Sequence, residues 1–416
     1  MIQKDNKIWI FIRAYNDLDN IIPVVYKLIL KKVGVHIIIT GSKSLLQDYR
    51  LKYLKNIGEF HLESINKYRK PLIFRLLGNL NDPNSLKELI YYELMGRSPN
   101  SPLISDVQIA DKLMKTVDEG DVICFDWDHS LFAQKVCKLS REKGVVTIAL
   151  PHACSPCLNY LLAKEAISLR KSEIKPHLDT YDFNIQPNTI NQQRSLHIGT
   201  SIKEKLPILG SPRYSKEWVN KHAEFADKYD WKGPGKVNFV FFLRDSNCAV
   251  HLEEMFRSLA ILRSYLEVNL VIKYHTRISR KSIRLMKFHA LDKHPNVRTA
   301  KDDISSISLI IWSDVVVNLG TSAAFDAVWF NKKIFSPEYL HPNISATGHY
   351  FPSSEIKTRD QWHDMTQKAI TSTENFTYSE EERQKFIKEM IEIEDEHVLD
   401  RYAKFITVQL KNIPSN

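Results

Sequence analysis

The segment 309–336 constrains the fold of this chain more than any other part of the sequence. It reads LIIWSDVVVNLGTSAAFDAVWFNKKIFS and predicts a strand at 315–319, a helix at 323–330 and a second strand at 333–335. Gly320 permits a sharp turn after the first strand, and Thr321 or Ser322 can cap the helix. A strand, a helix and a second strand in this order indicate a parallel sheet with helices packed against it.

The same alternation of apolar strands and helices runs through most of the chain. In the first half the pattern predicts strands at 7–12, 35–40, 121–125 and 145–150, and helices at 21–30, 45–55, 106–117 and 131–143. In the second half it predicts strands at 237–243, 270–274, 297–300, 315–319 and 333–335, and helices at 216–228, 251–266, 282–290, 304–312 and 323–330. Continuous apolar strands of this kind are buried on both faces of a parallel sheet. We therefore predict an α/β protein with two Rossmann-like doubly wound domains that face a central cleft.

A chain of 416 residues is too long for one ordinary hydrophobic core, so two domains are expected. The alternation lapses near 165–205, where the run DTYDFNIQPNTINQQ is polar and rich in turn formers. We predict an N-terminal domain at 1–205 with a loop-rich insertion near 165–205, and a C-terminal domain at 206–378. The remaining segment, 379–416, is expected to form C-terminal helices.

The charge balance favours anionic partners. The chain carries 58 Lys and Arg against 49 Asp and Glu, a net charge of +9, which suits a phosphorylated substrate, an anionic lipid surface or nucleic acid, and also an ordinary solvated surface. The basic residues are scattered and form no cluster with aromatic side chains, so we expect no nucleic-acid binding.

The sequence contains no apolar run of the roughly 18 residues that a membrane span needs. Its N-terminus, MIQKDNKIWIFIRAYND, has a short apolar core at 8–12 that Arg13 interrupts, and it lacks the h-region and the small-residue cleavage site of a signal peptide. We therefore expect a cytoplasmic protein, with peripheral contact at the inner face of the cytoplasmic membrane through its basic C-terminal helices.

Polar or ionisable residues follow five of the predicted strands. Ligands in doubly wound folds bind at the carboxyl ends of the strands, so these residues are candidates for a site. They are His152, Arg244-Asp245-Ser246, His275-Thr276-Arg277, Gly320-Thr321-Ser322 and Glu338.

The turn Gly320-Thr321-Ser322 is the strongest of these candidates. The first N–H groups of the helix that follows have no partners within the helix, and such a helix start attracts anions. We expect it to bind a phosphate or diphosphate. The sequence has neither a Walker A signature nor a GxGxxG motif.

The second half resembles the nucleotide-binding domain of the GT-B glycosyltransferases that build bacterial surface polysaccharide. One similar group, the polyol-phosphate polymerases of teichoic acid synthesis, carries His-Gly, Lys-x-His-Pro and Asp-Tyr-Ser-Ser motifs. The matching stretches here are His152-Ala153, Lys273-Tyr274-His275-Thr276 and Asn318-Leu319-Gly320-Thr321-Ser322. The chain departs from these motifs at Ala153, at Thr276 and in Asn318-Leu319-Gly320.

The chain also resembles the retaining β-Kdo transferases, which use CMP-Kdo and place a nucleophilic carboxylate in the cleft. Leu243-Arg244-Asp245 stands where that carboxylate is expected, and Leu209-Gly210-Ser211-Pro212-Arg213 looks like a turn common in surface-carbohydrate enzymes. The two resemblances together cover about residues 145–340.

The chemistry of sugar transfer suggests a role for each candidate. Asp245 would attack the anomeric carbon, His275 would donate a proton or hydrogen bond to the leaving phosphate, and His152 would deprotonate the acceptor hydroxyl. Each of the three also suits a structural role, Asp245 as a helix cap and the two histidines as hydrogen-bonded residues at a sheet edge.

Three further residues would hold the donor. Arg213 and Arg277 would bind anionic groups, and Glu338 would accept hydrogen bonds from a ribose diol. All three also suit the protein surface, where charged side chains need no ligand.

Other polar groups are open to more than one interpretation. Asp17 and Asp19 would touch the acceptor or cap the first helix. Asp126, Asp128 and His129, in FDWDHS, would form a metal site, contact the acceptor or cap a helix, and we favour the last two because GT-B enzymes as a class need no bound divalent metal. Cys154 and Cys157 lack the second ligand pair of a zinc site. We predict no metal and no cofactor.

These resemblances imply a glycosyltransferase that transfers Kdo, or a related ulosonic acid, from a CMP-linked donor. The expected acceptor is a growing bacterial surface polysaccharide or its lipid-linked precursor. The alternative is a CDP-polyol phosphotransferase of the teichoic-acid type.

Overall fold

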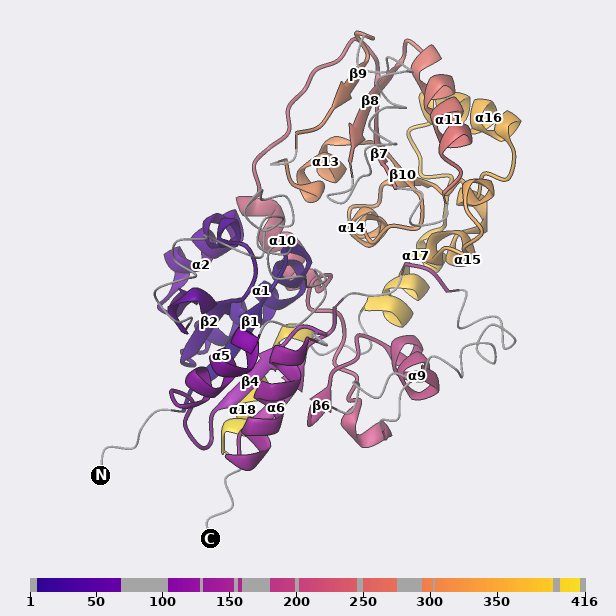
Figure 1. Cartoon of the computed structure of the whole chain (residues 1–416). Coiled ribbons are helices and arrows are strands. Elements are labelled where there is room, and N and C mark those ends of the chain that lie inside the picture. The colour runs from indigo at the N-terminus through magenta and orange to yellow at the C-terminus, as the bar shows by residue number, and fades with distance from the viewer. Residues whose placement is uncertain are drawn as a thin grey trace. The chain divides into compact units, whose positions relative to one another are not determined.

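A computed structural model shows two compact units (Figure 1). The described residues are 6–68, 104–127, 130–152, 156–158, 180–198, 202–244, 250–274, 294–301, 304–391 and 397–411. Unit 1 is made of residues 1–153, 170–215 and 392–416, and unit 2 of residues 154–169 and 216–391. Each unit is built around its own parallel sheet.

Unit 1 contains a six-stranded parallel sheet in the order β3-β2-β1-β4-β5-β6. The strands are β1 (Ile8–Ile12), β2 (Val35–Ile39), β3 (His61–Ser64), β4 (Val122–Phe125), β5 (Val146–Ala149) and β6 (Phe183–Asn184). The helices are α1 (Tyr15–Leu30), α2 (Tyr49–Ile57), α5 (Ile104–Met114), α6 (Leu131–Glu142), α9 (Thr189–Ile198) and α18 (Val398–Lys411), and Lys43–Gln47 and Ile65–Tyr68 form 3₁₀ turns. This strand order is that of a dinucleotide-binding Rossmann sheet.

Both faces of the unit 1 sheet are covered. Trp9 and Phe11 of β1 belong to a buried cluster that includes Leu113 of α5 and Phe132 of α6, and Phe11 stacks on Phe125 with ring centroids 4.5 Å apart. The intervening residues of β1 are equally buried. Burial on both faces explains why the strand is apolar throughout.

Unit 2 contains a five-stranded parallel sheet in the order β11-β10-β7-β8-β9. The strands are β7 (Val237–Phe242), β8 (Val268–Lys273), β9 (Val297–Thr299), β10 (Val315–Asn318) and β11 (Lys333–Phe335). The helices are α10 (Lys216–Phe225), α11 (Leu252–Ser264), α13 (Ser306–Trp312), α14 (Ala323–Trp329), α15 (Ala346–Tyr350), α16 (Arg359–Thr371) and α17 (Glu380–Phe386), with 3₁₀ turns at Glu338–Leu340 and Pro352–Ser354 and a π-helical turn at Ile387–Ile391. Its core joins Phe241 of β7, Leu259 of α11 and Phe335 of β11 to the fully buried Trp362 of α16.

The prediction of an α/β chain with two Rossmann-like sheets is confirmed. The helix predicted at 21–30 is longer and begins at Tyr15, because Asp17 Oδ2 accepts hydrogen bonds from the N–H groups of Arg13 and Ala14. The helix predicted at 45–55 is interrupted at Asp48. The helix predicted at 282–290 lies outside the described residues.

The loop predicted near 165–205 contains β6 and α9 in its described part. The hydrophobic pattern failed there because α9 buries polar side chains. Gln192 donates to the carbonyl of Leu206, and Ser195 donates to Gln186 Oε1. Hydrogen bonds therefore replace the apolar contacts that sequence periodicity detects.

The two helices of the C-terminal segment belong to different units. Unit 2 includes α17, and unit 1 includes α18. Tyr402 of α18 donates a hydrogen bond to the Gly210 carbonyl at 2.8 Å, and Asp400 pairs with Lys27 and Lys31 of α1 at 2.9 Å each. The domain limits 1–205, 206–378 and 379–416 stay a prediction about folding units.

A search of the described residues for a helix both long and apolar enough to cross a membrane found none.

Candidate functional site

Three ionisable side chains meet at the carboxyl edge of the unit 1 sheet. Asp17 follows β1 in the first turn of α1, Asp126 follows β4, and His152 follows β5. Because β1, β4 and β5 are consecutive in the sheet, their carboxyl ends lie side by side. One ligand atom from each residue lies within 4.8 Å of the others. We call these residues the Asp17–Asp126–His152 cluster.

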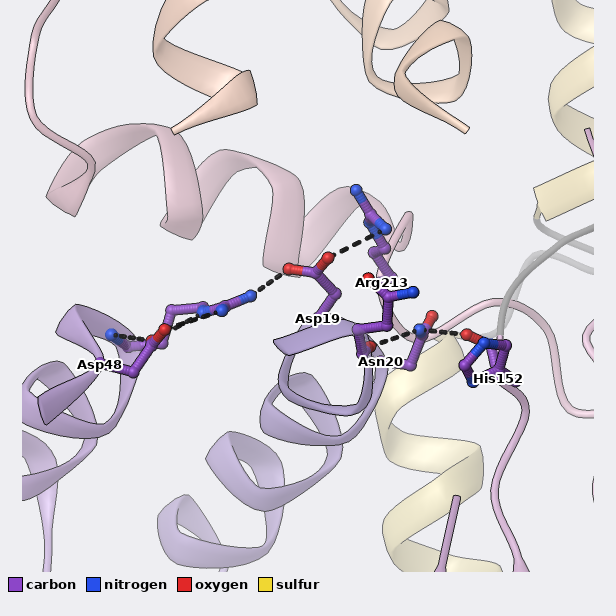
Figure 2. A network of polar contacts seen from close by, with 7 residues as sticks. Asp19, Asn20, Asp48, His152 and Arg213 are labelled. Atoms are coloured by element: carbon purple, nitrogen blue, oxygen red, sulfur yellow. Dashed lines mark hydrogen bonds and ion pairs between the residues drawn. The ribbon is translucent and has the colours of Figure 1, made fainter. Parts of the chain in front are cut away.

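His152 and Asp126 form a close hydrogen-bonded pair. His152 Nδ1 lies 2.6 Å from Asp126 Oδ2. The Asp126 side chain is 2% exposed, whereas the imidazole is 40% exposed. The backbone of His152 is held as well, because Asn20 of α1 donates a hydrogen bond to its carbonyl oxygen (Figure 2). The pairing engages Nδ1 and leaves Nε2 as the ring nitrogen that can exchange a proton with a substrate.

The surroundings of the cluster shift the pKa values of its three groups differently. The hydrogen bond that His152 donates to Asp126 raises the pKa of His152 against the effect of partial burial. Burial by itself would raise the pKa of Asp126, but the hydrogen bond and charge of His152 lower it. Burial and the neighbouring Asp126 raise the pKa of Asp17 to about 7. The arrangement is an ionised carboxylate paired with histidine, beside a second carboxyl group that retains its proton below neutral pH.

The buried oxygens of the two carboxyl groups support this assignment. Asp17 Oδ2 accepts from the N–H groups of Arg13 and Ala14, while Asp17 Oδ1 and Asp126 Oδ1 are buried and make no hydrogen bond within the described structure. Two adjacent carboxyl groups cannot both ionise at low cost in such surroundings. A proton retained on Asp17 removes that repulsion.

Two aspartates and a histidine at this spacing also have the ligand types of a divalent metal site. The 2.6 Å separation of Nδ1 and Oδ2 is a hydrogen-bond length, and an ion coordinated by both atoms would take the place of that bond. We therefore interpret the cluster as an Asp–His pair. The prediction that the chain needs no metal stays a prediction.

A second network lies beside this cluster at the start of α1 (Figure 2). Arg50 is buried and binds both oxygens of Asp48, at 2.8 and 2.9 Å, and also pairs with Asp19. Asp19 in turn pairs with Arg213 at 3.2 Å. Arg213, which we predicted to hold an anion, thus has an internal carboxylate partner and also lies 4.9 Å above the ring of Tyr214.

In unit 2 the predicted phosphate-binding turn follows β10 as expected. Gly320 has a φ of 66°, in the left-handed region that glycine favours. Arg244 donates to the carbonyls of Leu319 and Gly320, at 3.1 and 2.6 Å. Thr321 donates from both its N–H and its hydroxyl to Asn318 Oδ1, at 2.8 and 2.9 Å. The turn is therefore held from within by Asn318 and Arg244.

Ser322 precedes the first residue of α14, a helix of seven residues, and its side chain makes no capping hydrogen bond. Glu338 is half-buried beside β11, where its carboxylate accepts hydrogen bonds from the hydroxyl and the N–H of Ser345. Burial raises the pKa of Glu338 against the effect of these two bonds. Glu338 therefore fixes the start of α15 in this structure.

Asp245, His275 and Arg277 lie outside the described residues, so their predicted roles stay predictions. Sequence reasoning named Asp126 but did not pair it with His152, because strand order cannot be read from the sequence. Arg244 was noted only as part of a strand exit, and its contacts with the Gly320 turn were not anticipated.

No protein-family model and no curated protein matches the sequence. Solved structures do match over almost the whole chain. The S. aureus protein MnaA in complex with UDP is 12% identical, with a TM-score of 0.58, and the match covers 99% of this chain and 98% of MnaA. The chain has a GT-B-like fold.

Two further solved structures are similar. UDP-GlcNAc 2-epimerase from Neisseria meningitidis, bound to UDP-GlcNAc, is 12% identical with a TM-score of 0.54, and 98% of this chain and 100% of the epimerase are covered. The glycotransferase of kitacinnamycin is 10% identical with a TM-score of 0.53, at the same coverage. At these identities the likeness establishes the fold alone, and the specific resemblance to Kdo transferases stays a prediction.

Proposed function

We propose that this chain is a glycosyltransferase that uses a nucleotide-activated sugar donor. The observation that carries the proposal is the His152–Asp126 pair at the carboxyl edge of the unit 1 sheet. The GT-B-like fold supports it, since solved neighbours of this fold bind UDP or UDP-GlcNAc and one is a glycotransferase.

In this proposal His152 is the base that activates the acceptor. Its Nε2 takes the proton of an acceptor hydroxyl as the oxygen bonds to the anomeric carbon. Asp126 holds Nδ1–H, which fixes the tautomer, and stabilises the imidazolium that forms. General base catalysis of this type contributes about 10²- to 10⁴-fold to a rate.

The donor half of the reaction rests on the sequence resemblance. We assign Asp245 as the nucleophile that displaces the nucleotide phosphate and forms a glycosyl ester, and His275 as the donor of a proton to the departing phosphate. The acceptor oxygen then displaces Asp245, so two inversions give net retention.

We assign binding of the donor phosphate and ribose to Gly320, Thr321, Ser322, Glu338, Arg213 and Arg277. The Thr321 hydroxyl and the Glu338 carboxylate are hydrogen-bonded within the protein, and Arg213 is ion-paired with Asp19. To bind the donor, these side chains must exchange partners or use the hydrogen-bonding positions that remain to them. Gly320 has no side chain that must exchange partners, so its part in donor binding is the easiest part of the assignment to test.

For the donor we propose a CMP-linked Kdo or a related ulosonic acid, as the resemblance implies. The acceptor is then a growing bacterial surface polysaccharide or its lipid-linked precursor, reached by peripheral contact with the anionic inner face of the cytoplasmic membrane. Because the names of solved neighbours specify UDP, a UDP-linked sugar is the competing donor.

The donor assignment is tested by thermal unfolding of the full chain with CMP, CDP, UDP, GDP or ADP. A ligand that binds only the folded chain at about 100 times its Kd stabilises it by about 2.7 kcal/mol. We expect cytidine nucleotides to raise the melting temperature most. A response to UDP alone would replace the CMP donor, and no response to any of the five would contradict a nucleotide-dependent enzyme.

A CDP-polyol phosphotransferase is the alternative within the cytidine group. It would depend on His152 and His275 and would not need a carboxylate nucleophile. Asp245→Asn therefore separates the two, because it abolishes sugar transfer through a glycosyl ester and leaves polyol-phosphate transfer largely intact.

A second candidate function is that of a nucleotide-sugar 2-epimerase. The observation in its favour is the match with UDP-GlcNAc 2-epimerases over 98% of this chain. Moving a hydrogen at C2 also needs a base, so the His152–Asp126 pair suits this reaction too. An epimerase needs no acceptor, and that requirement distinguishes the two functions.

A further inference from the structure

Two histidines and a glutamate meet on the unit 1 sheet, away from the carboxyl edge. His36 lies near the start of β2, and its register partners are Trp9 of β1 and His61 of β3. The side chains of paired residues share one face of a sheet, and so does that of Glu63, two positions after His61. We call His36, His61 and Glu63 the edge histidine cluster.

The spacing within the edge histidine cluster fits metal ligation. His36 Nε2 lies 3.1 Å from Glu63 Oε1, and His61 Nε2 forms a hydrogen bond of 3.3 Å with Glu63 Oε2, which a bound ion would replace. All three residues offer ligand atoms within 4.8 Å of one another. Ligands at about 2.0–2.1 Å from a tetrahedral zinc ion are separated from each other by roughly 3.3 Å.

The orientation of His36 supports a shared centre. Its Nε2 is buried and makes no hydrogen bond within the described structure, even though Glu63 Oε1 lies 3.1 Å away. Two groups that ligate one ion point at the ion and not at each other. Such an arrangement accounts for the short separation of His36 Nε2 and Glu63 Oε1 without a hydrogen bond between them. An orphaned ring nitrogen of this kind would otherwise carry a desolvation cost.

Neighbouring side chains hold these ligands in place. Trp9 stacks on His36 with ring centroids 4.1 Å apart, and Tyr68 donates a hydrogen bond to Glu63 Oε1 at 2.6 Å. Outer contacts of this type orient metal ligands. Lys67 lies 2.7 Å from Glu63 Oε2, but its side chain is 63% exposed and can move away when a cation binds. A cavity of about 970 Å³, lined in part by Trp9, His36, His61 and Tyr68, gives access to the cluster.

We propose that His36, His61 and Glu63 form a binding site for a zinc-type divalent cation. Two imidazole nitrogens and one carboxylate supply three of four tetrahedral positions and leave the fourth for water or a ligand. Because His36 and His61 belong to adjacent strands, the ion would tie the edge strand β3 to the rest of the sheet.

The experiment uses the full chain, freed of metal by chelation and then dialysed against Zn²⁺, with bound metal measured by elemental analysis. We expect one zinc ion per chain. His61→Ala and Glu63→Gln should weaken binding by about 100-fold or more, since each removes a ligand. His61 is 57% exposed, so its replacement should leave the fold intact, and circular dichroism checks this.

Two control variants locate the ion. His197→Ala alters an exposed histidine of α9 and should bind zinc like wild type. His152→Ala should also retain zinc if the ion is at the edge histidine cluster. The proposal is overturned if wild type takes up no zinc, if His61→Ala binds zinc as tightly as wild type, or if His152→Ala is the variant that loses it.

A second readout is spectroscopic. Co²⁺ in a tetrahedral nitrogen–oxygen site absorbs visible light far more strongly than hydrated Co²⁺, so wild type should develop this absorption and His61→Ala should not. Zinc should also raise the melting temperature of wild type and leave that of His61→Ala unchanged. A visible spectrum shared by both proteins would contradict the assignment.

Discussion

Replacing Asp126 by asparagine tests the role of the His152–Asp126 pair. The substitution keeps the shape of the side chain and removes the charge 2.6 Å from His152 Nδ1. A hydrogen bond to a charged group contributes about 1.5–3 kcal/mol, and the 40% exposure of the His152 ring favours the lower end. About 1.4 kcal/mol corresponds to a tenfold change in rate, so Asp126→Asn should slow transfer at least about tenfold.

The loss of rate in His152→Ala sets an upper limit for the loss in Asp126→Asn. His152→Ala removes the whole contribution of the base, about 10²- to 10⁴-fold, and Asp126→Asn should slow transfer by no more than that. Because Asp126 acts through His152, the double variant should be no slower than His152→Ala alone. Rates that multiply in the double variant would refute the pairing, since independent residues have additive effects on the activation free energy.

The pH profile gives a further readout of the same substitution. The hydrogen bond that His152 donates to Asp126 raises the pKa of His152, and the base must be neutral to act. Removing the charge lowers that pKa, so the acid limb of the profile should move to lower pH while the plateau falls. Asp111→Asn, an exposed aspartate of unit 1, is the matched control and should leave both unchanged.

Three further outcomes are expected. Burial raises the pKa of Asp17 from 3.8 to about 7, so the folded chain binds this proton more tightly than the unfolded chain and loses stability as the pH rises from about 4 to about 7. Asp17→Asn should remove about 3 kcal/mol of the loss in unfolding free energy between about pH 5 and about pH 8, measured by urea unfolding. Plots of unfolding free energy against pH that run parallel for the two proteins would contradict this. Gly320→Ala places a Cβ 3.2 Å from Arg244 Nη1 and Cys157 Sγ at a φ of 66°, which should cost about 1–2 kcal/mol of stability and lower the melting temperature, whereas Gly34→Ala, with no atom nearer than 3.9 Å, should not. Tyr402→Phe removes a buried hydrogen bond to Gly210 and should cost about 0.5–1.5 kcal/mol in chemical unfolding, and an unchanged midpoint would show that α18 is held otherwise.

The parts of the fold that the sequence predicted are those with continuous apolar strands. In β1 and in β10 every residue is buried, so composition alone marks them. The helix predicted at 45–55 was drawn through Asp48, which instead caps α2 by accepting the N–H of Arg50 at 2.9 Å. An aspartate before a helical run is a capping signal, so a helix start at Tyr49 is consistent with the sequence.

The candidate site was predictable only in pieces. Asp17, Asp126 and His152 each follow a strand, which the sequence shows. Their meeting depends on β1 lying between β2 and β4 and on β5 following β4, an order that local sequence patterns do not carry. Likewise the sequence predicts the turn at Gly320, but Arg244, which holds that turn, follows β7 and is 76 residues away in sequence.

One measurement tests the central claim most directly. CMP-Kdo and UDP-GlcNAc are each incubated with the full chain, with and without a bacterial surface-glycan fraction as acceptor, and NMR follows the nucleotide and the sugar. We predict nucleotide release that requires both the acceptor and His152, with a new glycosidic signal. Conversion of UDP-GlcNAc to its C2 epimer without any acceptor, whether or not the rate depends on His152, would contradict the account.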